Sequence, residues 1–597
     1  MGFITAEAGL KSQYDVIVVG SGAGGGQAAY TLAMEGARVL MLEAGRRYDP
    51  ITETPMFQTP EQAPLRGWVT SDKPFGFYDA TVDGGWEVPG EPYVQGSAQA
   101  SEKFTWWRAR MLGGRTNHWG RISLRNGPYD FKPRTRDGLG FDWPISYEEL
   151  APYYDKVEML IGVYGSKEGL ENTPDSPDGC LLPAPKPLVS DLLIAKAGRK
   201  LGIPMVACHR AVLTEQLDWQ RSPAKLHPGN AAAQAIIAAD MKKRAACFWA
   251  TPCGRGCSIR ANYQSTTVHI PPALETGRLD IVTDAMVREV TLARNGTASG
   301  VIAVDRTTRR DFQVTGRAVV LAASALESVR ILLNSAPRGL ANSSGKLGKY
   351  IMDTVGSDLS GQIPLLENIP PHNEDGVAGG HLYSPWWLYK DQRAGKLGFA
   401  RGYHIEFGGG RHMPELSTAM GLEWLTGGSY GAKFKEDARR YYGSMVYFAG
   451  RGEMIPNEHS YCEIDPDTKD QWGIPVLRFH WKWSEHETRQ AAHMQQTFAR
   501  IIEAMGGRVQ GRVETDGTKA IAPGGGIIHE VGGAIMGENP RESVVNQWCQ
   551  AWDVKNLFVA DGAPFPSNAD KNPTLTIMAN AWRVADHILD RMRRKEL

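Results

Sequence analysis

Residues 14–45 read YDVIVVGSGAGGGQAAYTLAMEGARVLMLEAG, and this stretch decides the fold. Residues 16–19 form a short β-branched run of the kind found in buried parallel strands, and an alanine-rich helical pattern follows. The turn between them carries three glycines in the spacing G-x-G-x-x-G, namely Gly20, Gly22 and Gly25. Glycine is needed there because the backbone turns sharply and comes close to a pyrophosphate lying on the helix N-terminus.

A second apolar strand, residues 38–42, ends in Glu43. A carboxylate at this place can accept hydrogen bonds from the ribose of an adenosine. Strand, glycine turn, helix, strand and acid thus follow one another in the order of a Rossmann-like unit, which predicts a dinucleotide site. The unit by itself does not separate FAD from NAD.

The chain as a whole is long and carries no net charge. Its 597 residues exceed what one hydrophobic core supports and predict roughly two to four domains. With 66 basic and 66 acidic residues, the composition favours no binding to nucleic acid or anionic lipid, and a small neutral substrate fits better. We find neither a signal peptide nor an uncharged apolar run of the ~20 residues that span a bilayer, so we expect a soluble, cytoplasmic protein.

Two long segments, residues 50–100 and 355–430, are rich in proline, glycine and aromatic residues and show little periodicity. We expect both to be irregular and to pack over the nucleotide-binding core on the substrate side, because long loops in compact domains are usually functional. Residues 280–335 instead show strand and helix patterns.

Further motifs carry a family resemblance. They are RARMLGGRTNHWG at 108–120, DWPISYEELAPYYDKVEMLIGVYG at 142–165, SSGKLGKYIMDT at 343–354, and a C-terminal region with HEVGG from His529 and NPTLTI from Asn572. Together with the N-terminal unit they resemble the glucose-methanol-choline (GMC) oxidoreductases, above all the large flavoprotein subunits of bacterial sugar, gluconate and glycoside dehydrogenases. The resemblance implies FAD as the cofactor and the oxidation of a substrate alcohol.

The resemblance also implies an α/β fold, in which a Rossmann-like FAD-binding domain is built from discontinuous segments and a substrate-binding lobe contains a mixed or antiparallel sheet. We expect the FAD-binding domain to comprise residues 1–150, 240–355 and 510–597. We expect the substrate-binding domain to comprise residues 151–239 and 356–509.

His529 and Asn572 are the expected catalytic residues. Removing a hydride from a carbinol carbon requires that the hydroxyl proton leave too, and the ordinary pKa of imidazole, ~6.5, suits a base at neutral pH. In the family a histidine and a second histidine or asparagine occupy these two motifs, so the resemblance makes His529 the base and lets the Asn572 amide hold the same hydroxyl. Asn572 also suits an ordinary helix N-cap with Pro573 at the first helical position, and both roles can coexist. The helix N-terminus would place partial positive charge beside the flavin.

The expected cofactor site draws on many parts of the chain. The resemblance places Gly113 and Gly114 beside the isoalloxazine, Asn117 and His118 over the ring, and Asp561 at the ribityl or pyrophosphate group. In some relatives a histidine in a similar sequence is bonded covalently to the flavin. We favour packing without such a bond for His118, because Asn117 stands where those relatives carry threonine. The expected cofactor-binding residues are Gly20, Gly22, Gly25, Glu43, Arg110, Gly113, Gly114, Asn117, His118, Val287, Asp561 and Thr574.

Three cysteines, Cys247, Cys253 and Cys257, have the spacing C-x5-C-x3-C. Thiolates can ligate iron and sulfide, and a three-iron cluster needs only three protein ligands. The cytochrome-coupled sugar dehydrogenases carry a cysteine group in this region, but with one more cysteine next to the first. An iron–sulfur cluster, a disulfide and buried reduced thiols therefore all stay open.

The expected reaction is FAD-dependent oxidation of a hydroxyl group of a sugar or glycoside to a ketone. Aromatic residues in the presumed substrate half suit the apolar faces of sugar rings, and they include Trp386, Trp387, Tyr403, Trp424 and Tyr447. Close alternatives are a lactone-forming C1 dehydrogenase and a sugar oxidase that uses oxygen. Alternatives from other classes are a flavin-dependent hydroxylase, an NAD-linked reductase and a non-catalytic FAD-binding protein. The resemblance also implies a small subunit and a cytochrome-type electron acceptor, and export with such a partner would take the chain to the periplasm.

Overall fold

A seven-stranded sheet holds the first βαβ unit of the chain. The computed structural model describes residues 2–54, 56, 62–68, 70–73, 81–217, 226–249, 253–370, 380–410, 422–423 and 425–597, and every structural statement below concerns these residues. Strand β1 (Tyr14–Val19) pairs in parallel with β2 (Val39–Leu42) on one side and with β12 (Asp311–Leu321) on the other. The predicted strand–helix–strand beginning of the fold is confirmed.

The other strands of this sheet come from distant parts of the chain. β9 (Leu279–Val282) pairs in parallel with β2, and β20 (Leu557–Val559) pairs in parallel with β12. At the opposite edge, β10 (Ala285–Leu292) and β11 (Ala298–Asp305) continue from β12 in antiparallel order. The sheet therefore assembles only after residues separated by hundreds of positions have met.

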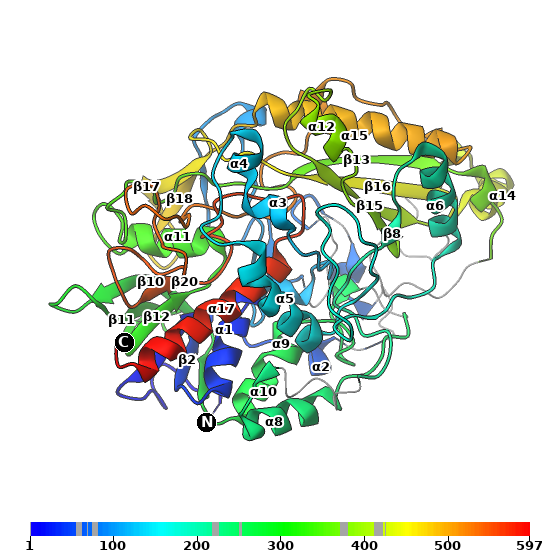
Figure 1. Ribbon diagram of the computed structural model, residues 1–597. Coiled ribbons are helices and arrows are strands. Elements are labelled where there is room, and N and C mark those ends of the chain that lie inside the picture. Colours follow the sequence, from blue (N-terminus) through cyan, green and yellow to red (C-terminus); the bar gives the residue numbers. More distant parts are fainter. Residues whose placement is uncertain are drawn as a thin grey trace.

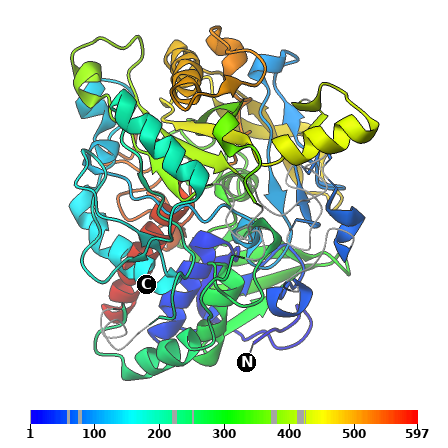
Figure 2. The same ribbon diagram turned by 90° about the vertical axis from the view of Figure 1, so that its right-hand side faces the viewer.

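Two helices pack together against the start of this sheet. They are α1 (Ala23–Met34) and α17 (Thr574–Arg593), and Figures 1 and 2 show them next to each other. Val16, Ile17 and Val18 of β1 have no exposed surface, as expected of a central parallel strand. The N-termini of both helices point towards the carboxyl ends of the strands, where ligands bind in open α/β sheets.

A second, six-stranded sheet is antiparallel throughout. Its strands, in spatial order, are β19 (Arg508–Val509), β13 (Val355–Gln362), β16 (Met445–Gly452), β15 (Tyr403–Gly409), β14 (Leu382–Ser384) and β8 (Val206–Ala207). The long helix α15 (Glu485–Ala504) packs on β13 and β16 and lies on the outside of the molecule (Figure 1). With both sheets in place, the predicted α/β fold class is confirmed.

The expectation that residues 355–430 are irregular is wrong, because β13, β14 and β15 lie within them. Glycines in these strands interrupt the alternation of apolar and polar residues by which a strand is recognised in a sequence. A Cβ on Gly361 would lie 2.7 Å from Cγ2 of Ile502 in α15, and one on Gly450 would lie 2.4 Å from Sδ of Met494 in the same helix. The helix approaches the sheet so closely that only glycine fits at these positions, and the usual alternation of apolar residues is lost. In residues 50–100 the structure shows strands of only two residues and short helical turns, as expected.

The division of the chain into two domains stays a proposal. All strands of the seven-stranded sheet lie in the segments proposed for FAD binding, and all strands of the six-stranded sheet lie at residues 206–207 and 355–509. Helices α5 (Tyr147–Ile161) and α8 (Ala231–Met241) do not follow this division simply, since α5 contacts α17 and α8 contacts α10 (Ile270–Glu275).

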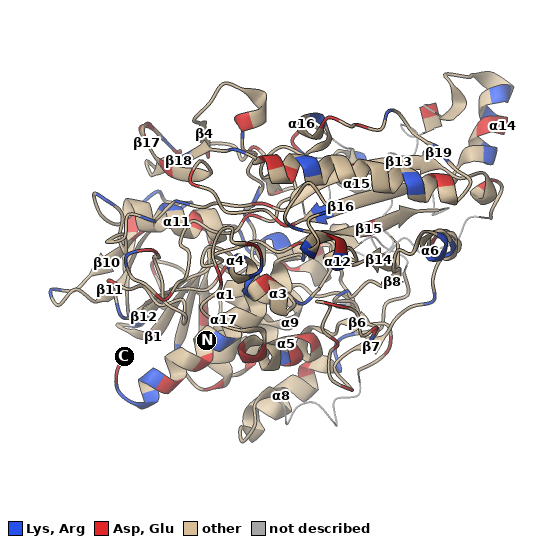
Figure 3. Ribbon diagram, turned by 45° about the horizontal axis from the view of Figure 1, so that its top comes forward, with Lys and Arg blue, Asp and Glu red and all other residues tan. Residues whose placement is uncertain are grey.

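Charged residues of both signs are interspersed over the molecule. Figure 3 shows both basic and acidic residues on α15 and on α14 (Gly431–Tyr441), in keeping with the balanced composition. None of the helices in the described part of the chain is long and apolar enough to cross a membrane.

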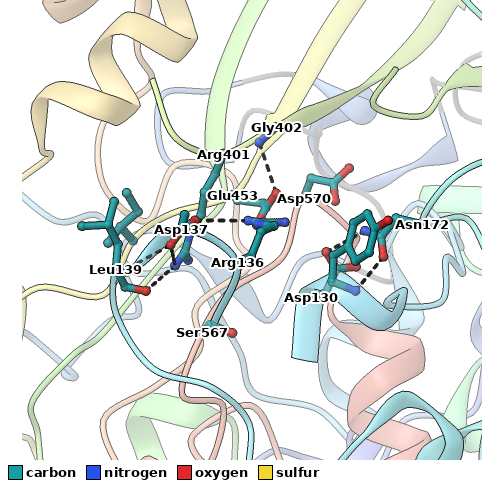
Figure 4. A network of polar contacts seen from close by, with 12 residues as sticks. Asp130, Arg136, Asp137, Leu139, Asn172, Arg401, Gly402, Glu453, Ser567 and Asp570 are labelled. Atoms are coloured by element: carbon teal, nitrogen blue, oxygen red, sulfur yellow. Dashed lines mark hydrogen bonds and ion pairs between the residues drawn. The ribbon is translucent and has the colours of Figure 1, made fainter. Parts of the chain in front are cut away.

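A buried network of ion pairs joins the parts of the chain that carry the two sheets (Figure 4). On α4 (Pro133–Asp137), Arg136 Nη2 lies 2.9 Å from Oε2 of Glu453, which follows β16. Arg401, which precedes β15, donates from Nε to Oδ2 of Asp137 at 3.0 Å. Lys571 Nζ lies between Asp570 Oδ1 at 2.6 Å and Asp130 Oδ2 at 3.0 Å. Oxygen atoms of Asp130, Glu453 and Asp570 come within 4.8 Å of one another, and the neighbouring lysine and arginine balance their charge.

Candidate active site

A cavity of about 360 Å³ opens where the two sheets face each other. Its floor is formed by the carboxyl ends of β1, β2 and β12 and by the first turns of α1 and α17. Glu406 of β15 and Arg451 of β16 line it from the six-stranded sheet. The cavity therefore occupies the usual ligand position of an open α/β sheet and is closed by the second sheet.

The glycine turn leaves room for a dinucleotide. Gly20 has φ of 99°, a conformation that L-residues rarely adopt, and a Cβ there would lie 2.3 Å from the carbonyl oxygen of Ala322. A Cβ on Gly22 would meet nothing within 4 Å, because this glycine faces the cavity. A side chain at Gly22 would fill the place in which a pyrophosphate lies on the N-terminus of α1.

Polar groups along the cavity fit the rest of an FAD molecule. The buried Glu43 accepts hydrogen bonds from the backbone N–H groups of Ser21 at 3.2 Å and Gly45 at 2.7 Å, and burial raises its pKa. Arg108 is buried, lines the cavity and has no partner for its Nε and Nη2 atoms. Buried donors without partners are costly, so they indicate an acceptor-rich ligand. Arg110, which we predicted for this role, lines the same cavity but is paired with the carboxylates of Glu91 and Glu327.

The predicted cofactor residues divide into two groups. Those that line the cavity are Gly20, Gly22, Glu43, Arg110, Gly114, His118, Val287, Asp561 and Thr574. Gly25, Gly113 and Asn117 do not line it. Gly25 lets α1 pack against the turn, since a Cβ there would lie 2.0 Å from the carbonyl oxygen of Gly20. The buried Asn117 donates to the carbonyl oxygen of Leu112 at 2.9 Å, which holds the loop.

The two predicted catalytic residues lie together at one end of the cavity. The Nδ2 atom of Asn572 lies 3.4 Å from Nε2 of His529. Nδ1 of His529 lies 3.0 Å from the hydroxyl of Thr354, and the backbone N–H of His529 donates to Asp353 at 2.9 Å. Asp353 and Thr354 end the motif SSGKLGKYIMDT, so the sequence contained a signal for them that we did not interpret. Burial, reinforced by the charge of Arg451, lowers the pKa of His529 to about 3.

The interpretation of Asn572 as a helix N-cap is wrong. Helix α17 begins at Thr574, its N-cap residue is Pro573, and no side chain caps it by a hydrogen bond. The Asn572 side chain instead donates from Nδ2 to Oε1 of Glu406 at 3.2 Å. Its amide is therefore directed at His529 and at the six-stranded sheet, while the N-terminal end of α17 opens into the cavity at Thr574.

Charged residues of the six-stranded sheet form the wall behind this pair, and sequence reasoning missed them. Oε1 of Glu406 lies 3.3 Å from Nε2 of His404, and Oε2 lies 3.7 Å from Nη2 of Arg451. Although burial opposes ionisation, the charge of Arg451 and the hydrogen bond from His404 hold the pKa of Glu406 well below its usual range. Glu406 is therefore an anion at neutral pH.

His118 and Asp561 lie at the cavity with other partners of their own. Nε2 of His118 accepts a hydrogen bond from the indole N–H of Trp107 at 3.0 Å. Asp561 accepts from the hydroxyl of Ser328 at 2.5 Å and from the backbone of Ala563 at 2.9 Å, and burial raises its pKa to about 6. Trp107 and Trp119 are the aromatic residues that accompany His118 along the wall.

Of the aromatic residues that we singled out for a sugar, the four that the structure describes do not line the cavity. Trp386 and Tyr403 are buried in a cluster whose rings lie 4.9 Å apart, and Trp387 packs against the same tyrosine. Tyr447 is exposed. These four rings belong to the core and surface of the second lobe, and Trp424 lies outside the described residues.

Cys247, Cys253 and Cys257 line a separate cavity of about 10 Å³. None of the three is joined to another cysteine, so the disulfide alternative is wrong. Burial raises the pKa of Cys247 to about 12 and also raises that of Cys257. The guanidinium of the buried Arg121 donates to the carbonyl oxygen of Cys253 at 2.7 Å and supplies positive charge beside the thiols. The donor set suits soft metal ions, although the space between the thiols holds about one water molecule.

Comparison with known proteins agrees with this site. Residues 15–49 match an FAD binding domain, residues 229–360 the N-terminal domain of GMC oxidoreductases and residues 456–581 the C-terminal domain. The chain is 31% identical to 2-methyl-1,2-propanediol dehydrogenase of Mycolicibacterium austroafricanum, with 96% of this chain and 95% of the relative covered. It is 28% identical to the fructose dehydrogenase large subunit of Gluconobacter japonicus, with 97% and 98% covered.

A solved structure shows the same fold. The chain is similar to formate oxidase of Aspergillus oryzae with a TM-score of 0.62, 13% identity and coverage of 99% of this chain and 100% of the other. Together the fold, the dinucleotide cavity and the histidine beside it define an FAD-binding oxidoreductase. The chain belongs to the GMC oxidoreductase family, and it is an enzyme that acts on CH–OH groups. This assignment favours alcohol oxidation over the hydroxylase, NAD-linked and non-catalytic alternatives.

Proposed function

We propose that the protein oxidises a secondary hydroxyl group of a sugar or glycoside to a ketone, with His529 as the base. The observation that carries this proposal is the pair formed by His529 Nε2 and Asn572 Nδ2, 3.4 Å apart at the cavity. A substrate hydroxyl can replace this direct contact, because its oxygen can accept from the amide while its proton is donated to the imidazole. Bound FAD would accept the hydride released from the same carbon.

The surroundings of His529 keep its imidazole unprotonated. Its pKa, lowered to about 3, leaves the ring able to take a proton from the hydroxyl at physiological pH, while it weakens the driving force for that transfer compared with an ordinary histidine. Asn572 holds the hydroxyl oxygen without adding charge. The free N–H groups at the start of α17 attract negative charge that develops in the cavity.

The relatives support a polyhydroxylated substrate. The names of three of these relatives refer to fructose, gluconate and 2-methyl-1,2-propanediol. A small vicinal diol is the second candidate substrate, favoured by the higher identity to the diol dehydrogenase. C1 oxidation of a sugar to a lactone would use the same two residues.

A substrate screen tests this proposal. The purified holoenzyme is mixed under nitrogen with D-fructose, D-glucose, D-gluconate, a C-glycoside and 2-methyl-1,2-propanediol, and bleaching of the flavin absorption is recorded. We expect rapid bleaching with at least one of these compounds, and product analysis by NMR then distinguishes ketone, lactone and aldehyde. Failure of all five to reduce a fully loaded flavin would overturn the proposal.

The proposal extends to the route by which electrons leave. We propose that a small subunit and a cytochrome-type acceptor take them up, as in the dehydrogenases whose large subunits this chain resembles. The convergence of Cys247, Cys253 and Cys257 on one cavity supports an iron–sulfur cluster at this place, for which the thiols would have to move apart. Export together with such a subunit would place the protein in the periplasm.

Iron analysis and electron paramagnetic resonance on anaerobically purified protein test this part separately. We expect about three irons per flavin in the wild type and loss of the signal in Cys253→Ser, while Cys180→Ser, at a buried cysteine outside the group, leaves it unchanged. Absence of iron, together with peroxide formation as fast as dye reduction, would make the enzyme an oxidase.

A further inference from the structure

The environment of Glu406 fixes the direction of the Asn572 amide. A carboxylate anion can only accept hydrogen bonds, and the partly buried Glu406 has three donors around it. They are Asn572 Nδ2 at 3.2 Å, His404 Nε2 at 3.3 Å and Arg451 Nη2 at 3.7 Å. The nitrogen of the Asn572 amide must therefore face Glu406, because the amide oxygen in its place would meet a second acceptor.

The direction of the amide in turn fixes the tautomer of His529. The same Nδ2 atom that donates to Glu406 lies 3.4 Å from Nε2 of His529 and has a second proton to offer. Nε2 is then the acceptor, so the proton of the neutral ring sits on Nδ1 and is donated to the hydroxyl of Thr354 at 3.0 Å. In this tautomer the electron pair of Nε2 accepts from Asn572, and it can accept from a substrate hydroxyl that takes the place of the amide.

Buried charged groups also connect the segments that carry Glu406 and Asn572. His404 lies with Nδ1 3.6 Å from Oδ2 of Asp570, two residues before Asn572, and Asp570 is paired with Lys571. Although burial opposes its charge, Asp570 and Glu406 raise the pKa of His404. His404 thus connects the strand that carries Glu406 to the segment that carries Asn572.

We propose that Glu406, supported by His404, is a positioning residue that keeps His529 in the tautomer able to accept the substrate proton. This inference rests on the proposed function, since it assumes that His529 is the base. Glu406 acts through Asn572, and its effect on the reaction is to set the direction of two hydrogen bonds. Its carboxylate does not take the proton.

Two substitutions separate this role from packing. Glu406→Gln keeps the size of the side chain but can donate, so the Asn572 amide can turn over and present its oxygen to His529. Glu406→Asp leaves a gap but keeps a group that only accepts. We expect the maximal rate of flavin reduction to fall by on the order of 10–10³-fold in Glu406→Gln, as befits a base held in the wrong tautomer, and by less in Glu406→Asp, with substrate affinity changing little in both. Glu463→Gln is the matched control, because Glu463 is half-exposed and also pairs with a histidine, His480.

The rates are measured by anaerobic stopped flow with D-fructose and 2-methyl-1,2-propanediol as probes. The opposite order, with Glu406→Gln near wild type and Glu406→Asp impaired, would show a packing role and overturn the inference. A second readout does not depend on turnover: ¹⁵N NMR of histidine-labelled, FAD-free protein, with the His529 signals assigned by their absence in His529→Ala. We expect the proton on Nδ1 in the wild type and a changed tautomer in Glu406→Gln, and an unchanged tautomer would also overturn the inference. If His529→Ala itself keeps the wild-type rate, the proposed function fails, and the NMR result still decides the part played by Glu406.

Discussion

At the residue scale, the meeting of His529 and Asn572 at the cavity could be predicted, and the residues around them could not. His529 and Asn572 stand in motifs whose order and spacing are specific, so the sequence indicated both. Glu406 and Arg451 lie on strands of the second sheet and reach the pair only through tertiary packing. Arg108 could have been chosen instead of Arg110 only by knowing that Glu91 and Glu327 already neutralise the latter.

Replacing His529 tests the base directly. We expect His529→Ala to retain FAD and to lose on the order of 10²–10⁴ in the rate of flavin reduction, the usual contribution of a positioned base. The measurement is anaerobic stopped flow with a saturating substrate. His459→Ala serves as control because His459 is exposed. A folded, flavin-loaded His529→Ala protein that is reduced at the wild-type rate would remove this residue from the mechanism.

The pH dependence of reduction follows from the environment of His529. Its pKa is lowered to about 3, so the imidazole stays unprotonated as the pH falls through the ordinary histidine range near 6.5. We therefore expect the limiting reduction rate to stay constant between about pH 7 and pH 5. The measurement is a stopped-flow series over this interval. A tenfold fall per pH unit below pH 6.5 would show that the base titrates normally.

The contact between His118 and Trp107 predicts how the flavin is held. Nε2 of His118 is occupied by the indole N–H, which favours an imidazole that packs against the cofactor without a covalent bond. We expect acid precipitation of the protein to release all of the FAD into the supernatant. Flavin fluorescence that stays with the denatured protein, and is lost in His118→Ala, would show covalent attachment.

At the scale of elements, the first sheet was easier to predict than the second. The strands of the Rossmann-like unit are short, apolar and local in sequence, so their pattern is visible. In β13 and β16, glycines replace the inward-facing side chains because α15 lies directly upon them, and periodicity disappears where packing is tightest. A sequence pattern reveals a strand through its alternating side chains. In β13 and β16 the backbone of the glycines makes the contact with α15, so this alternation is missing.

This close approach can be tested by adding a side chain. We expect Gly450→Val to lower the free energy of unfolding by about 1–3 kcal/mol, the usual cost of overpacking, because its Cβ would lie 2.4 Å from Sδ of Met494. Activity should fall as well, since Arg451, the next residue of β16, lines the cavity. Thermal and urea unfolding measure the first effect, and Gly398→Val, at an exposed glycine with ordinary contacts, is the control. Equal stabilities of the two variants would contradict the packing argument.

At the scale of the whole molecule, the two sheets and the cavity between them form one unit. Residues that precede α5 or follow β20 meet residues of the six-stranded sheet in the buried ion pairs of Figure 4. The family resemblance predicted a second lobe with its own sheet, but it contained no information on these contacts. Each contact pairs two opposite charges that lie hundreds of residues apart in the sequence, and no local pattern predicts such a pair.

The same ion pairs limit how far the two lobes can move relative to each other. A hinge that swung one lobe away from the other would pull Arg136 from Glu453, Arg401 from Asp137 and His404 from Asp570, and each of these pairs has at least one buried partner. Separating buried opposite charges costs several kcal/mol for each pair. We therefore expect the radius of gyration from X-ray scattering to be the same with and without saturating substrate, where clamshell closure would reduce it. Substrates then pass through an entrance of fixed width, and the size of the opening sorts them before any chemistry begins.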